Sequence, residues 1–284
     1  MQLMGLKEKY KKEVNYMIRY YCSGYDVKDA FGHGLADMLK TELKDTKSII
    51  YIPAGEERVE KVANKFIPSF ESSFERNGIH FENTISKETD EKKQLEERKK
   101  RIINPSMTTE QAISLLENAS MIMITGGDPY ILKDMCEKMG ILETLKKYDG
   151  VLMGYSAGAM LMSKKIIITP CSDEYPEFHI EDGLNLDGIS IFPHNNTTED
   201  EYPEVLDIGG EIYRKEDNIK VAQEYGEFYL LQDNMNDDMS FDVSIIKSTN
   251  GNLEYYTENN GKIWLATSEG IELFVPELSK RIKR

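Results

Sequence analysis

The sequence predicts an α/β fold, with a doubly wound, mostly parallel sheet and a C-terminal antiparallel β extension. From about residue 16 to residue 226, short apolar runs alternate with segments of helical spacing, which is typical of β-α-β units. After about residue 227 the pattern changes to short strands separated by Asn250-Gly251 and Asn260-Gly261, two strong hairpin signals. We therefore predict a single domain over residues 1–284, with a β-rich extension over about 227–284.

The N-terminal half begins with a charged leader over residues 1–15 and then alternates between strands and helices. Three apolar runs are predicted to be strands: 16–22, 48–53 and 79–85. A helix is predicted over about 56–76, although this segment contains Pro68. The dense run of both charge signs within 87–105 indicates a solvated helix or a mobile insertion. Residues 109–119 carry apolar side chains at helical spacing and predict the next helix.

The hexapeptide GYSAGA at residues 154–159 is the most informative stretch of the chain. It follows the apolar run 151–153 and precedes a helix-compatible apolar run. Between a strand and a helix, the pattern G-x-S-x-G forms a nucleophile elbow, with the serine at the apex of a sharp turn. The following helix directs its N-terminal N–H groups toward charge that develops there. The alternative is a Gly-rich turn in which Ser156 only caps the helix, but the flanking strand and helix favour a catalytic serine.

A second turn, TGGDP at residues 125–129, follows the apolar run 121–124. Asp128 is predicted to cap a helix in which Pro129 is the first residue. Open α/β sheets bind ligands at the carboxyl ends of their strands, and an oxyanion hole needs two donors there. Our candidates are the backbone N–H groups of Gly127 and Ala157. The alternative for the glycine pair is a simple strand-to-helix turn.

The chain contains four histidines as candidates for a general base: His33, His80, His179 and His194. His194 follows the apolar run 189–192, which predicts that it lies at the carboxyl end of a strand. His179 lies in an acidic stretch with no strand end before it, His33 follows the first predicted strand, and His80 is expected within a strand. His194 is therefore the predicted base for Ser156, and His179 is the alternative.

The two turns together resemble the dipeptidase E/cyanophycinase family of serine peptidases over roughly residues 47–232. That family is similar to the class I glutamine amidotransferase fold. The resemblance implies a Ser-His-acid hydrolase that cleaves peptide bonds, with Ser156 matching the nucleophile. The family's histidine lies in a short Pro-His segment, which Phe192-Pro193-His194 matches here.

The third member of such a triad is open between two acids. Class I amidotransferases carry an acid two residues after the histidine, but Asn196 occupies that position here. Glu224, expected at the end of a short strand, falls one residue from a position where the dipeptidase family carries Glu or Asp before glycine. Asp173 matches an acidic position downstream of the family's elbow. The chain has 50 acidic residues, so the alternative for each candidate is an ordinary solvated carboxylate on the surface.

Composition restricts the function classes. The formal net charge of −15 disfavours nucleic acid and anionic membranes as partners, because both attract basic surfaces. No apolar run is long enough to span a membrane, the N-terminus lacks the apolar core of a signal peptide, and three widely spaced cysteines indicate reduced thiols. We therefore expect a cytoplasmic enzyme without a metal site or cofactor. Its expected partner is a small peptide substrate, and a homodimer is left open.

The substrate is predicted from charge. The dipeptidase branch prefers an acidic N-terminal residue, which requires a basic group near the site. Residues 195–213 contain no lysine or arginine but six acids, namely Glu199, Asp200, Glu201, Glu204, Asp207 and Glu211. This favours a peptide with a free amine or a basic side chain. Two alternatives remain open: an esterase or amidase with the same triad, and a catalytically inactive binding or regulatory protein of this fold.

Overall fold

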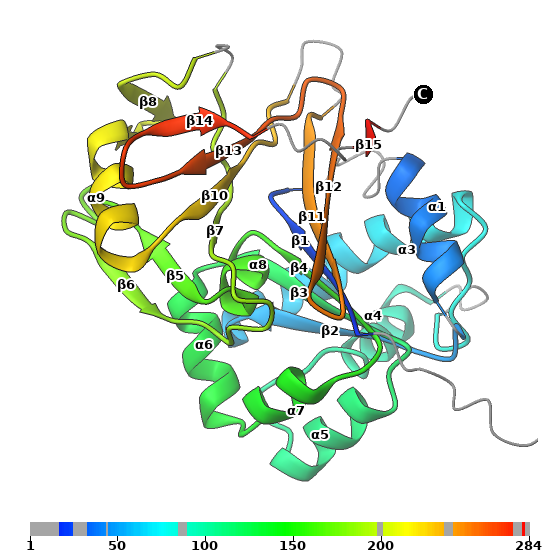
Figure 1. Cartoon of the computed structure of the whole chain (residues 1–284). Coiled ribbons are helices and arrows are strands. Elements are labelled where there is room, and N and C mark those ends of the chain that lie inside the picture. The colour runs from blue at the N-terminus through cyan, green and yellow to red at the C-terminus, as the bar shows by residue number, and fades with distance from the viewer. Residues whose placement is uncertain are drawn as a thin grey trace, which may run out of the picture.

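The computed structural model describes residues 17–24, 33–43, 45–84, 90–197, 201–235, 241–274 and 280–281, and the predicted leader 1–15 lies outside them. Within these residues, the central sheet has seven strands in the order β15-β12-β11-β1-β4-β3-β2 (Figure 1). Their bounds are β1 Ile18–Cys22, β2 Ile49–Ala54, β3 Met121–Gly127, β4 Val151–Tyr155, β11 Val243–Thr249, β12 Asn252–Glu258 and β15 Lys280–Arg281. Strands β1, β4, β3 and β2 are parallel, whereas β11 runs antiparallel to β1. The predicted mostly parallel α/β sheet with antiparallel C-terminal strands is confirmed.

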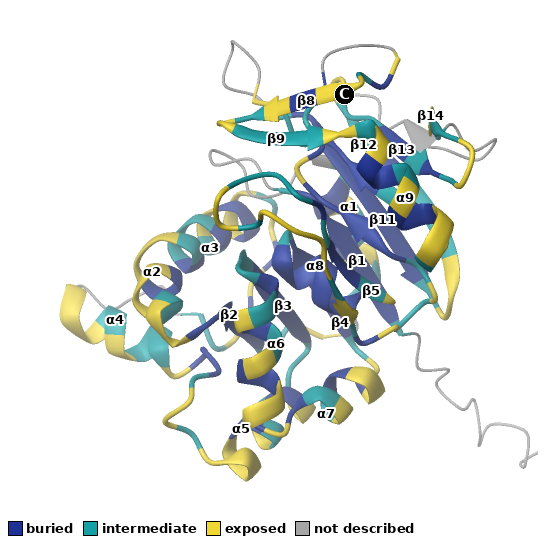
Figure 2. Ribbon diagram, turned by 90° about the vertical axis from the view of Figure 1, so that its left-hand side faces the viewer, coloured by how far each residue is buried: buried dark blue, intermediate teal, exposed yellow. Residues whose placement is uncertain are grey.

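Helices bury both faces of the parallel strands, which explains why these strands are mostly apolar rather than alternating (Figure 2). The exception in β1 is Arg19, which is buried in an ion pair with Asp187. One face packs against four helices: α5 Thr109–Glu117, α6 Pro129–Lys138, α7 Leu142–Lys147 and α8 Ala157–Met162. The other face packs against α1 His33–Glu42 and α3 Ile67–Arg76, where Leu39, Phe70 and Phe74 are buried against Tyr51 and Met153. The two layers leave the carboxyl ends of the strands at one edge.

The predicted helix over 56–76 is one helical run with a change of pitch. It begins as the short turn η1 Glu56–Arg58, continues as α2 Val59–Lys61, widens into a π segment over Val62–Phe66 and ends as α3. Pro68 is at the start of α3, directly after the wide turn. Because proline lacks an N–H group and its ring crowds the preceding turn, a wider turn accommodates it inside the run.

The predicted strand over 79–85 is wrong for its described residues, which form a turn up to Thr84. Ile79 and Phe81 are buried, so their apolar character reflects packing rather than strand pairing. The free edge of β2 is instead covered by other groups. The Asn83 side chain bonds both the N–H and the carbonyl group of Ile49, and Tyr51 pairs with Ile102 in a parallel bridge.

A second sheet has the order β14-β13-β10-β7 and lies next to the central one (Figure 1). Its strands are β7 Ile191–Phe192, β10 Phe228–Leu231, β13 Ile263–Ala266 and β14 Ile271–Leu273. Two hairpins, β5 Lys165–Ile168 with β6 His179–Asp182 and β8 Val205–Ile208 with β9 Glu211–Arg214, precede the helix α9 Lys215–Tyr225. Trp264 is buried in a small core between β10, β13 and α9. The C-terminal strands therefore contribute to both sheets.

The charged segment within 87–105 contains the helix α4 Glu91–Lys99, which has no buried residue, and residues 87–89 lie outside the described part.

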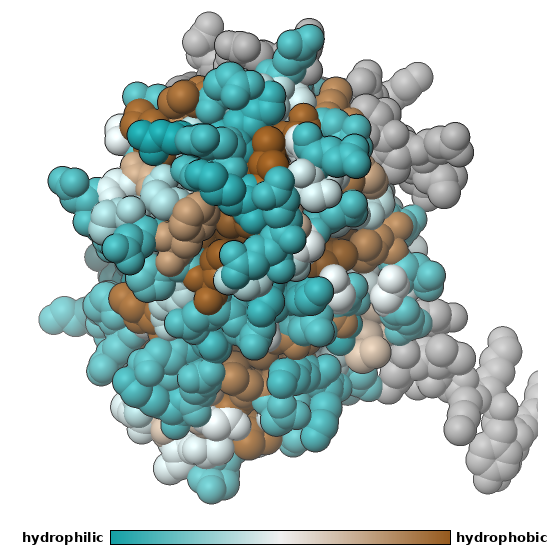
Figure 3. All heavy atoms as spheres, turned by 60° about the vertical axis from the view of Figure 1, so that its left-hand side comes forward, coloured by the Kyte–Doolittle hydropathy of each residue, from teal (hydrophilic) through white to brown (hydrophobic). Residues whose placement is uncertain are grey.

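Figure 3 shows a largely hydrophilic face on which apolar side chains form small, separate patches. None of the helices in the described residues is both long and apolar enough to cross a membrane.

Candidate active site

Ser156 lies between the end of β4 and the start of α8, with a φ of 52° and a ψ of −115°. This strained conformation is that of a nucleophile elbow, which raises the serine above the sheet edge. Close backbone packing explains the neighbouring glycines. A Cβ on Gly154 would lie 2.6 Å from the Gly158 carbonyl carbon, and a Cβ on Gly158 would lie 2.3 Å from the Ile124 oxygen. The elbow therefore requires glycine on both sides of Ser156.

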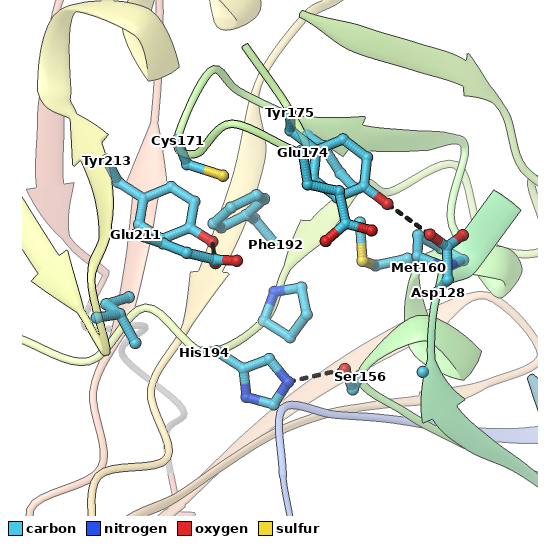
Figure 4. A pocket seen from close by; sticks show the side chains of 15 residues that line it. Asp128, Ser156, Met160, Cys171, Glu174, Tyr175, Phe192, His194, Glu211 and Tyr213 are labelled. Atoms are coloured by element: carbon cyan, nitrogen blue, oxygen red, sulfur yellow. Dashed lines mark hydrogen bonds between the residues drawn. The ribbon is translucent and has the colours of Figure 1, made fainter. Parts of the chain in front are cut away.

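His194 follows β7 and meets Ser156 across the strand ends. The distance from His194 Nε2 to Ser156 Oγ is 2.7 Å (Figure 4). The backbone of His194 has a φ of 59°, and its N–H donates to Ser23 Oγ at 2.7 Å. Ser23, directly after β1, in turn donates its hydroxyl to the Leu231 carbonyl at 3.0 Å. Ser23 is thus a positioning residue that the sequence reasoning missed.

The carboxylate at His194 is that of Asp233, whose Oδ2 lies 2.7 Å from His194 Nδ1. If Nδ1–H donates to Asp233, Nε2 is free to accept the Ser156 hydroxyl proton. Asn196 holds the acid in place, because its Oδ1 accepts the Asp233 N–H at 2.9 Å. Gly24 leaves room for it, since a Cβ there would lie 2.1 Å from Asp233 Oδ2.

Neither Glu224 nor Asp173 is at this position, so the predicted third acid is corrected. Glu224 is exposed on α9 and bonds Tyr225, because residues 219–224 form a helix and not the expected short strand. Asp173 is exposed in the loop between β5 and β6. Asp233 instead follows β10, which pairs in parallel with β7, so both strands end beside each other. The apolar run 228–231 followed by an acid was the signal that could have identified it.

Two backbone groups were predicted as oxyanion donors. Ala157 is the first residue of α8, directly after Ser156. Gly127 ends β3 and lines the same pocket as Ser156. Its neighbour Gly126 packs against Ser156, because a Cβ there would lie 3.1 Å from Ser156 Cβ. Asp128 caps α6 with Pro129 as its first residue, as predicted, and accepts bonds from the N–H groups of Tyr130 and Ile131.

The pocket beside Ser156 and His194 has a volume of about 390 Å³, within the range of small-ligand sites. Its apolar part includes Met160, Ile168 and Phe192, and the carboxylates of Glu174 and Glu211 face the space near His194 (Figure 4). Asp128 also lines it but accepts the Tyr175 hydroxyl at 2.5 Å. Among the described residues lining this pocket there is no lysine or arginine.

The charges around His194 favour its protonated form. Desolvation of the half-exposed ring opposes protonation, but the hydrogen bond and charge of Asp233, with the charge of Glu211, outweigh it and raise the pKa of His194. Cys171 also lines the pocket, and burial raises the pKa of its thiol. The thiolate is the reactive form, so this environment does not activate Cys171 as a competing nucleophile.

The other histidines lie elsewhere. His179 is exposed at the start of β6, where its ring contacts Tyr130 and Tyr175. His80 is exposed in the turn after α3 and not within a strand. His33 begins α1, and its side chain lies outside the described residues.

Replacing Asp233 with asparagine is expected to lower kcat about 10⁴-fold, since the imidazole would lose both its orienting acceptor and the charge that stabilises its protonated form. Steady-state kinetics with a small peptide measure this effect. The matched controls, Asp173→Asn and Glu224→Gln, should retain activity near that of the wild type. A control variant as damaged as Asp233→Asn would show that the hydrogen bond to His194 does not identify the functional acid.

The sequence matches the family model of peptidase family S51 over residues 22–224, whereas no curated protein matches it. Among solved structures, a peptidase from an acI-B1 Actinobacterium is 15% identical, with a TM-score of 0.52 over 92% of this chain and 95% of that one. A putative peptidase E protein from Listeria monocytogenes EGD-e is 16% identical, with a TM-score of 0.51 over 84% of this chain and 98% of that one. These two likenesses concern the fold. The family match spans most of the sequence, and the chain therefore belongs to peptidase family S51.

Proposed function

We propose that the protein is a serine peptidase that hydrolyses small peptides through Ser156, His194 and Asp233. The observation that supports this proposal best is the continuous pair of 2.7 Å hydrogen bonds from Ser156 Oγ through the imidazole to Asp233. A hydroxyl in contact with an oriented imidazole is the arrangement that activates serine for acyl transfer. The strained elbow adds to the argument, since such backbone strain is concentrated at functional sites.

In the proposed mechanism, Ser156 Oγ attacks the scissile carbonyl carbon while His194 Nε2 takes the hydroxyl proton. The backbone N–H groups of Gly127 and Ala157 stabilise the oxyanion that forms. His194 then donates its proton to the leaving amine, and the peptide bond breaks to leave an acyl-Ser156 ester. Water, deprotonated by His194, hydrolyses this ester and restores the free serine.

The proposed substrates carry a positive charge, either a free N-terminal amine or a basic side chain. The carboxylates of Glu174 and Glu211 face the pocket, and Glu211 is the member of the predicted acidic segment that lines it. Within that segment, Glu199 and Asp200 lie outside the described residues, and Glu204 pairs with Lys215 at 2.9 Å. Glu211 accepts the Tyr213 hydroxyl at 2.5 Å, which fixes one of its oxygens.

A fluorophosphonate probe combined with a substrate panel tests the proposed function. The probe should label the wild-type protein at Ser156, and dipeptides should be cleaved faster than simple esters or amides. Labelling with cleavage of esters alone would favour a non-peptidase serine hydrolase. Absence of both labelling and hydrolysis would favour a binding or regulatory protein. Faster cleavage of Asp-Leu than of Lys-Leu or Ala-Leu would contradict the preference for a positive charge.

Replacing Glu211 with glutamine should produce two separate effects. KM for Lys-Leu is expected to rise about tenfold, as for loss of a charge-assisted hydrogen bond. The base form of His194 exists only above its raised pKa, so kcat/KM should increase with pH through that value. Removal of the Glu211 charge lowers the pKa of His194. The rising part of the pH profile of kcat/KM, its acidic limb, should therefore move to lower pH. Glu204→Gln, with its carboxylate normally paired to Lys215, is the matched control and should leave both KM and the limb unchanged.

A further inference from the structure

Arg58 lies beside the turn that carries the predicted oxyanion donor. It ends η1, directly after β2, and its N–H donates to the Gly55 carbonyl at 3.3 Å. A Cβ placed on Gly127 would lie 2.9 Å from Arg58 Cδ and 3.0 Å from its Nε. The side chain of Arg58 therefore packs directly over the Gly127 backbone, and the adjacent Gly126 contacts Ser156. The Arg58 side chain thus lies against the turn that carries the predicted oxyanion donor.

The guanidinium of Arg58 has no carboxylate partner among the described residues. Its Nε is buried without a hydrogen-bond partner in this part of the chain. The Nε atoms of Arg19 and Arg101 also lack a hydrogen-bond partner, but these two guanidinium groups form ion pairs, Arg19 with Asp187 at 3.0 Å and Arg101 with Glu71 at 2.6 Å. The half-buried Arg58 thus differs from these two arginines in having no ion pair with a described carboxylate, in a chain with 50 acidic residues against 35 basic ones. A buried donor without a partner costs free energy, and it calls for a functional explanation.

The charges near Ser156 are divided between two places. The carboxylates of Glu174 and Glu211 face the pocket, whereas Arg58, in η1 after β2, contacts the end of β3 and does not line that pocket. A short peptide with free ends has the same division, with an ammonium group at one end and a carboxylate at the other. The planar guanidinium fork matches a carboxylate in both shape and charge.

We propose that Arg58 binds the C-terminal carboxylate of a dipeptide and thereby determines specificity for a substrate whose leaving residue ends in a free acid. This inference rests on the proposed peptidase function and extends it to the amino acid that is released when the peptide bond breaks. Arg58 anchors the leaving amino acid, and the acidic pocket receives the amine of the other residue. The peptide bond then lies at Ser156 in dipeptides, while a longer chain moves the carboxylate out of reach.

The test measures binding of Ala-Leu and of its C-terminal amide to the Ser156→Ala protein by calorimetry, which requires no turnover. The free acid should bind about tenfold more tightly than the amide, as expected for a hydrogen-bonded charge pair. Arg58→Gln should remove this difference by weakening the acid alone, and Arg58→Lys should restore part of it. Arg214→Gln, which alters an exposed arginine at the end of β9, is the control and should keep the full preference.

Equal binding of acid and amide to the protein with Arg58 intact would overturn the proposal without any variant at Arg58. Equal weakening of both ligands by Arg58→Gln would also overturn it, since that result indicates a structural role. The proposed peptidase function fails separately, through absence of hydrolysis and fluorophosphonate labelling in the wild-type protein. Retention of the acid preference in such a protein would leave Arg58 as a carboxylate-binding residue.

Discussion

Replacing Ser156 with alanine is expected to reduce peptide hydrolysis by about 10⁵- to 10⁶-fold and to abolish labelling by a fluorophosphonate. The reason is that Ser156 Oγ, the proposed nucleophile, lies 2.7 Å from His194 Nε2. The remaining pocket and backbone donors still bind substrate, so residual catalysis above the uncatalysed rate comes from them. Active-site labelling and steady-state kinetics measure both effects.

The fold should survive this replacement. Alanine and serine tolerate the positive φ at residue 156 about equally, so the variant loses mainly one hydrogen bond, worth about 1 kcal/mol. Thermal unfolding therefore separates loss of chemistry from loss of structure. Undiminished labelling of the alanine variant would show that another residue is the nucleophile.

Replacing His194 with alanine is expected to lower kcat by at least about 10³-fold, as loss of a triad base does. Without the imidazole, no group takes the Ser156 proton or donates one to the leaving amine. The residual activity should also lose the acidic limb that His194 imposes on the pH profile. The rate measured across pH with Lys-Leu gives both results.

His179→Ala is the control for this variant. His179 is exposed at the start of β6, and its ring contacts Tyr130 and Tyr175. Loss of this ring should therefore leave the rate near that of the wild type. The opposite ranking of the two variants would identify His179 as the base and refute the proposed mechanism.

The positions of Ser156 and His194 were predictable from the sequence because each directly follows an apolar run that ends at the same sheet edge. Local patterns identify strand ends well, and parallel strands bring their ends together. The apolar strands 18–22, 49–54 and 151–155 were predictable for the same reason, since they are buried on both faces.

The carboxylate that bonds His194 could not be predicted, because its place depends on pairing between segments far apart in the sequence. Asp233 meets His194 only because β10 pairs in parallel with β7, with Leu230 opposite Phe192. Glu224 is a candidate only if residues 219–223 form a strand. The acids in the first turn and Gly226 after the last turn instead suit the helix α9. The turn at 79–84 shows a similar limit, since its apolar residues pack without pairing.

The two sheets have a joint role in holding the reacting groups. Ser156 extends from the central sheet, whereas His194 and Asp233 extend from the second one, and Ser23 bonds across the junction to both His194 and Leu231. A local opening between the sheets separates the proton acceptor from the hydroxyl while each sheet keeps its own hydrogen bonds. The proposed catalytic arrangement therefore depends on that junction, and we expect loosening there to abolish activity before the core of either sheet unfolds.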